Sequence, residues 1–168
     1  IFQDAPTLGS LIDPSAQKNR LDTATFDELE PLLGKALSNG KNAEVTERGV
    51  AAHGIARAAE LLSAGYHLVS TNVPYVARGN QSEKLKSFAD ENYEASKSNL
   101  ATIFAERCIS LTRPNGTYSS VLPQGWLYLK SYEGLRRRIL DRLDWRLVAR
   151  LGQNAFEEIS GEVVNVLL

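Results

Sequence analysis

The sequence has no methionine, a single cysteine and no long apolar run, and each of these excludes a class of protein. The lone Cys108 cannot form an intrachain disulfide, which favours a reducing compartment such as the cytosol. No apolar run approaches the roughly 20 residues that a membrane helix needs. Residues 1–6 lack the basic and apolar stretches of a signal peptide. Because the chain begins at Ile1 without a methionine, we expect a piece of a longer reading frame.

Positive and negative charges are nearly balanced in this sequence. The 168 residues carry a formal net charge of −1, and 43% of them are hydrophobic. This composition is typical of a folded globular protein and excludes a disordered chain. It also excludes a strongly basic nucleic-acid module, although a local basic face stays compatible with it.

Strands alternate with helices along the chain. We expect loop over residues 1–22, and helices over 25–37 (interrupted by Pro31), 44–64, 82–91, about 99–111 (capped by Ser96 or Ser98) and 131–143. A turn is expected over 113–116, and strands over 66–71, 117–122, 145–151 and 162–168. This order predicts an α/β fold with a mostly parallel sheet flanked by helices. Ligands of such sheets bind beyond the carboxyl ends of the strands, so the turns at Asn72 and Pro123 should share one functional edge.

The turn after the first predicted strand, Ser70-Thr71-Asn72-Val73-Pro74-Tyr75, offers a distinctive set of groups. Pro74 holds Val73 in extended backbone and fixes the direction of its carbonyl. Asn72 adds a side-chain acceptor and Tyr75 a flat ring, a combination that suits a planar substrate carrying an amino group. Taken alone, these residues favour an ordinary strand-to-loop turn with a core tyrosine, because short motifs often match by chance.

The wider sequence resembles a known family. The run from Thr71 to Tyr75 is similar to the N-P-P-Y signature of amino-group DNA methyltransferases that act on adenine. Further matching segments follow in order, at residues 96–108, 116, 121–127, 131–136, 151–152 and 155–164. A weaker match lies upstream, at residues 9–12. Together they resemble the large methylases of BREX phage-defence systems and of single-chain restriction–modification enzymes. The resemblance covers roughly residue 66 to the end.

The resemblance implies a fold, a substrate and a cofactor. The fold would be part of a Rossmann-like class I methyltransferase. The enzyme would flip an adenine out of double-stranded DNA and methylate its N6 with S-adenosylmethionine. By resemblance, the Asn72 side chain and the Val73 carbonyl accept hydrogen bonds from the adenine amino group. Tyr75 stacks on the base from one side and Phe156 from the other.

Two residues depart from the family pattern, and two parts of the family's architecture are missing. Valine stands at position 73, where relatives usually carry proline, and its backbone carbonyl is retained. Asn99, near the implied cofactor pocket, stands where relatives usually carry aspartate. We find neither the glycine-containing turn nor the acidic residue that mainly bind the cofactor, nor a downstream target-recognition domain.

The domain assignment follows from these gaps. Residues 1–65 are assigned to a loop and helical segment leading into the methylase core, and residues 66–168 to the catalytic part. The isolated chain is expected to be inactive and to self-associate through an incomplete sheet. The resemblance further implies a bacterial or archaeal cytoplasmic protein that works with other defence-system subunits.

The remaining candidates are weaker, and two other functions stay open. Arg78 and Lys84 lie near the catalytic turn and are candidate DNA contacts. The basic residues around 136–150 are interleaved with acidic ones and are typical of a solvated helix face. No histidine or cysteine has partners at metal-ligand spacing, so no metal site is predicted. The alternatives are an N-methyltransferase acting on RNA or protein glutamine, and a catalytically inactive methylase-like domain that binds DNA or a partner.

Overall fold

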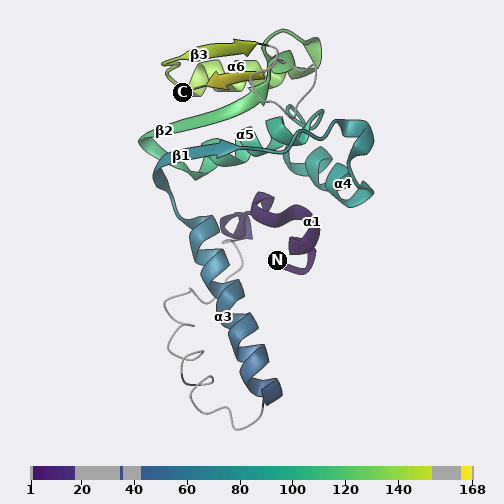
Figure 1. The fold of residues 1–168 in the computed structure, drawn as a ribbon, viewed down its shortest axis with the longest axis vertical. Coiled ribbons are helices and arrows are strands. Elements are labelled where there is room, and N and C mark those ends of the chain that lie inside the picture. The colour runs from purple at the N-terminus through teal and green to yellow at the C-terminus, as the bar shows by residue number, and fades with distance from the viewer. Residues whose placement is uncertain (1, 18–34, 36–42, 153–163, 168) are drawn as a thin grey trace. The chain divides into compact units, whose positions relative to one another are not determined.

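The computed structural model describes residues 2–17, 35, 43–152 and 164–167, and it divides the chain into two compact units (Figure 1). The first unit comprises residues 1–64 and the second residues 65–168. Each unit is described by itself below.

The first unit is helical in the residues described. Short helical turns follow one another at Phe2–Asp4 (η1), Ala5–Leu8 (α1), Gly9–Leu11 (η2) and Pro14–Gln17 (η3). The expectation of loop over these residues is therefore wrong. Pro6 fits the first turn of α1, where a missing N–H costs nothing, and Leu8 and Leu11 are buried.

A long helix, Ala43–Ser63 (α3), confirms the helix expected over 44–64. The helix expected over 25–37 lies outside the described residues apart from Lys35. Among the described residues, no helix combines the length and the apolar character that crossing a membrane requires.

The second unit is built on a four-stranded sheet. Its strands are Tyr66–Asn72 (β1), Thr112–Pro123 (β2), Val148–Gly152 (β3) and Val164–Leu167 (β4), in the order β1-β2-β4-β3. β1 is parallel to β2, whereas β4 is antiparallel to both β2 and β3. Three of the four strands therefore run in one direction, but only the pairing of β1 with β2 is parallel. The expected α/β class and its parallel strand pair are confirmed, whereas the sheet as a whole is mixed.

The turn expected over 113–116 is instead part of β2. Tyr66 pairs with Thr112 and Leu68 with Thr117, so β2 carries extra residues opposite β1. Asn115 has a φ of 63°, which asparagine tolerates better than most residues. A Cβ at Gly116 would lie 3.0 Å from the Tyr66 carbonyl oxygen, so a glycine allows the two strands to approach. The polar residues that predicted a turn thus form a bulge within the strand.

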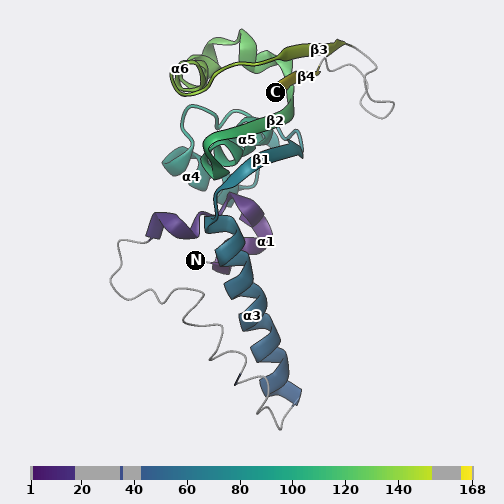
Figure 2. The same ribbon diagram turned by 90° about the vertical axis from the view of Figure 1, so that its left-hand side faces the viewer.

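Among the described residues of this unit, three helices and three short helical turns lie between the strands in sequence. The helices are Glu83–Asn92 (α4), Leu100–Leu111 (α5) and Glu133–Arg142 (α6), with short turns at Arg78–Asn80 (η4), Gln124–Leu127 (η5) and Lys130–Tyr132 (η6). Tyr118 and Leu122 of β2 belong to a buried cluster that also includes Cys108 of α5 and Ile139 of α6. Figure 2 shows α5 running beside β1 and β2.

Candidate functional site

The candidate site begins where β1 ends. Asn72 is the last residue of β1 and pairs with Val121, two residues before the end of β2 at Pro123. Because β1 and β2 are parallel, their carboxyl ends lie at the same edge of the sheet. The expectation that the Asn72 and Pro123 turns share an edge is confirmed.

Burial differs from residue to residue along the turn after β1. The Val73 side chain is only 7% exposed and belongs to the core cluster that includes Leu122 and Trp126. Tyr75 is half-buried and packs against the same cluster, whereas Asn72 and Pro74 are exposed. Valine at position 73 therefore anchors the turn in the core, a role that its hydrophobic side chain fills well.

Asn72 is available for a ligand. Its exposed side chain makes no hydrogen bond with any residue that the structure describes. The amide oxygen can therefore accept from a bound group without breaking an internal bond. An amide oxygen of this kind is able to accept a hydrogen bond from an amino group.

The segment after the turn is fixed to the start of α5 by backbone hydrogen bonds. Leu100 N–H donates to the Val76 carbonyl at 2.9 Å, and Arg78 N–H donates to the Ser98 carbonyl at 3.0 Å. Ala77 and Asn99 form an isolated antiparallel bridge between the same two segments. Val76 directly follows Tyr75, so these bonds restrain the backbone beside the tyrosine.

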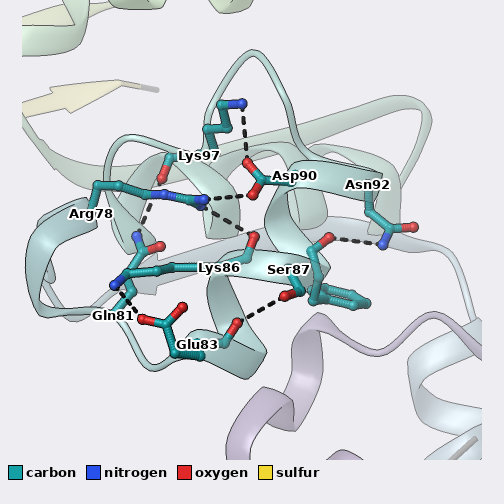
Figure 3. A network of polar contacts seen from close by, with 9 residues as sticks. Arg78, Gln81, Glu83, Lys86, Ser87, Asp90, Asn92 and Lys97 are labelled. Carbon is teal, nitrogen blue, oxygen red and sulfur yellow. Dashed lines mark hydrogen bonds and ion pairs between the residues drawn. The ribbon is translucent and has the colours of Figure 1, made fainter.

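A buried glutamine joins the same two segments from the side (Figure 3). Gln81 is 4% exposed, and its Nε2 donates to the carbonyls of Val76 and Lys97, each at 3.3 Å. Sequence reasoning missed this residue, because one glutamine ahead of a helix cap has no distinctive pattern. Only the folded chain shows that Gln81 reaches Lys97, which lies 16 positions further along the sequence.

An ion-pair network lies beside Gln81 (Figure 3). Asp90 accepts from Arg78 Nη2 at 2.7 Å and lies 3.1 Å from Lys97 Nζ. Arg78 Nη1 also donates to the Lys86 carbonyl at 3.3 Å. Hydrogen bonds from Lys97 and Arg78 hold the pKa of Asp90 below its ordinary value. The Arg78 guanidinium thus has partners within the protein, and its role as a DNA contact, like that of the exposed Lys84, stays a prediction.

Asn99 is the N-cap of α5. Its side-chain oxygen accepts from Ala101 N–H at 2.9 Å, so the cap is Asn99 and not Ser96 or Ser98 as expected. Ser96 is fully buried and donates instead to Glu106 Oε2 at 2.5 Å. Asparagine and aspartate cap helices about equally well, so the departure from aspartate preserves this structural role. A contact between Asn99 and the cofactor stays a prediction.

The other candidates add little to this edge. Phe156 lies outside the described residues. Cys108 is buried in the core, and burial raises the pKa of its thiol, so that the unreactive protonated form persists at neutral pH. Within the part of the chain that the structure describes, no three His, Cys, Asp or Glu side chains are grouped to hold a metal ion.

Comparison with known proteins identifies the family. The model of the Eco57I restriction-modification methylase family matches residues 10–156. The chain belongs to this family. The match spans most of both units and includes the Asn72 turn, which confirms the resemblance to restriction–modification methylases.

Two relatives of this methylase chain are much longer proteins. It is 35% identical to the adenine-specific methyltransferase BrxX of Escherichia coli O9:H4 (strain HS) over 166 residues, which cover 98% of this chain and 13% of BrxX. It is 39% identical to the adenine-specific methyltransferase PglX of Lacticaseibacillus casei (strain Zhang) over 110 residues, covering 64% of this chain and 9% of PglX. The methylase chain therefore spans about a tenth of the length of these relatives.

Proposed function

We propose that this chain is the catalytic portion of an adenine-N6 DNA methyltransferase of phage defence or restriction–modification. Residues 66–168 form the catalytic part, and residues 1–65 lead into it. The observation that carries the proposal is the turn after β1: Asn72 is exposed and free to accept, while Val73 and Tyr75 are anchored in the core. Relatives named adenine-specific methyltransferases support the choice of substrate.

The residues of the turn would act by binding and orientation. The Asn72 side-chain oxygen and the Val73 carbonyl would accept the two hydrogens of the adenine amino group and hold N6 in place. This pairing needs no general base. Tyr75 stacks on the flipped base, which is worth about 1–3 kcal/mol and offsets much of the cost of flipping. Holding the base in a fixed orientation would further favour the reaction.

The cofactor implied by the family is S-adenosylmethionine, which supplies the electrophilic methyl group. The described residues do not fit a complete site for it. The Asn99 amide oxygen is occupied by the cap of α5. A cavity of about 670 Å³ among the described residues of this unit lies at the amino half of β2, and not beside Asn72. We therefore propose that other parts of the full protein hold most of the cofactor.

The proposed partner is duplex DNA in the bacterial or archaeal cytoplasm, together with other subunits of a defence system. The sheet presents exposed apolar side chains, among them Leu68 at 64% and Leu151 at 40% exposure. Such surface favours association with further protein, and in the isolated chain it favours self-association. Light scattering of the purified chain over a range of concentrations tests this point, and a constant monomer mass would contradict it.

A methyl-transfer assay of the full-length protein tests the proposed function. Labelled S-adenosylmethionine and unmethylated duplex DNA would be incubated with the wild-type protein, with Asn72→Ala and with Asn80→Ala. Asn80 is an exposed asparagine in the same loop without a side-chain hydrogen bond to a described residue, which makes it a matched control. We expect N6-methyladenine with the wild type and Asn80→Ala, and none with Asn72→Ala.

Other outcomes would overturn the proposal. Label on RNA or on protein glutamine, and none on DNA, would assign a different acceptor. No label on any acceptor, with a folded and cofactor-bound protein that still binds DNA, would assign a catalytically inactive binding domain.

A further inference from the structure

The second unit contains a cavity of about 670 Å³ away from the Asn72 turn. It is formed by the end of α5, the amino half of β2 and the segment between α6 and β3. Asn72 pairs with Val121 near the carboxyl end of β2, whereas the cavity is lined by residues 112–118 of the same strand. The cavity is therefore separate from the proposed adenine site.

Three arginines from different segments line this cavity. Arg113 comes from β2, Arg142 from the end of α6 and Arg146 from the segment before β3. All three are exposed, and none makes an ion pair or hydrogen bond with a residue that the structure describes. Asp144 is the acidic residue among the lining residues. The lining therefore carries an excess of positive charge.

Neighbouring arginines on α6 behave differently. Arg136 donates to the carbonyls of Trp126 and Leu129, each at 2.7 Å. Arg137 pairs with Glu133 at 2.8 Å, and Arg138 pairs with Glu106 at 2.9 Å. These arginines are occupied within the protein. The contrast separates the basic stretch around residues 136–150 into structural arginines and arginines directed to the cavity.

The surroundings favour an anionic ligand further. Gly65 gives room for the Arg113 side chain, because a Cβ at this position would lie 2.7 Å from Arg113 Cγ. Trp145 also lines the cavity, and its buried indole N–H has no acceptor among the described residues. Guanidinium forks and an unpaired N–H donor match the oxygens of a phosphate group.

We propose that this cavity binds a phosphorylated small molecule, such as a nucleoside phosphate, through Arg113, Arg142 and Arg146. The volume lies within the range of about 300–1,000 Å³ that is usual for small-molecule sites. A concave site also suits a small ligand better than the broad surface of a duplex. Backbone phosphates of DNA share the same chemistry, and the experiment separates the two sources. This site is independent of the proposed methyl transfer.

Isothermal titration calorimetry of the full-length protein with pyrophosphate tests the site. Arg142→Gln/Arg146→Gln removes two charges from the cavity, and Arg137→Gln removes one charge from the exposed face of α6 as a matched control. We expect the double variant to weaken pyrophosphate binding about tenfold or more, with little change in the control, because charge-assisted hydrogen bonds are lost only in the first. Both variants should keep the wild-type melting temperature, since the replaced arginines are exposed.

A second arm uses short duplex DNA in place of pyrophosphate. Unchanged DNA affinity in the double variant supports a small phosphorylated ligand. Loss of DNA affinity, with displacement of pyrophosphate by DNA, assigns the cavity to the DNA backbone and overturns the small-molecule source. Absence of pyrophosphate binding to the folded wild type, or equal binding in the wild type and the double variant, overturns the site itself.

Discussion

Replacing Gln81 by leucine should loosen the loop that follows the Asn72 turn while leaving the core packed. Leucine has a similar volume and suits the buried position, but it cannot donate to the carbonyls of Val76 and Lys97. The Val76 carbonyl keeps its bond from Leu100 N–H. The Lys97 carbonyl loses the Gln81 donor. The effect should therefore be local.

The magnitude follows from the number of hydrogen bonds. Each is worth about 0.5–1.5 kcal/mol net, so two lost bonds cost about 1–3 kcal/mol. Gln81 Oε1 is itself buried without a partner among the described residues, and its removal offsets part of that cost. We expect a net loss of about 1 kcal/mol in the local stability of the loop, or about a fivefold change in its opening equilibrium. Gln81→Glu should cost more, because a buried carboxylate would face two carbonyl oxygens.

Hydrogen exchange measured by mass spectrometry on the full protein checks this order. Peptides that contain the Arg78 and Leu100 amides should lose protection in the order wild type, Gln81→Leu, Gln81→Glu. Gln3→Leu, the same substitution at an exposed position, is the control and should leave these peptides unchanged. Equal protection in wild type and Gln81→Glu would refute the argument that the Gln81 amide holds the two segments together.

Three further outcomes are expected. Asn99→Ala should destabilise α5 by about 1 kcal/mol through loss of its N-cap, whereas Asn99→Asp should be nearly neutral, and urea unfolding that ranks the two variants equally would contradict the cap. Because the pKa of Asp90 is lowered in the folded state, its contribution to stability is present above the ordinary carboxyl pKa and is lost as the pH falls through the lowered value. Asp90→Asn should therefore reduce the fall in melting temperature at acid pH. An unchanged fall would contradict a contribution of Asp90 to the pH dependence of stability. The isolated 168-residue chain should show no methyl transfer to duplex DNA, because the residues that the structure describes do not form a complete cofactor site, and turnover by the purified chain would contradict this expectation.

The elements that the sequence predicted best are those whose pattern is local. Strand β1, helix α4 with its Ser82 cap, and helix α3 were expected nearly where they occur, because apolar periodicity and capping residues act over a few positions. The first residues failed because short helical turns lack such a period. The Pro114-Asn115-Gly116 run failed because a bulge and a turn need the same residue types, and only pairing with β1 distinguishes them.

The sequence by itself determined the family, the α/β class and the turn at Asn72, because these depend on residues adjacent in the chain. Tertiary structure alone decided which side chains serve that turn and which are free. Gln81 reaches Lys97, and Arg78 reaches Asp90, only once α4 has folded back on the loop. The same holds for the arginine cavity, since Arg113 and Arg146 are far apart in the chain and meet only through the packing of β2 against the segment after α6. Contacts between distant residues depend on the whole packed unit, and no local pattern encodes them.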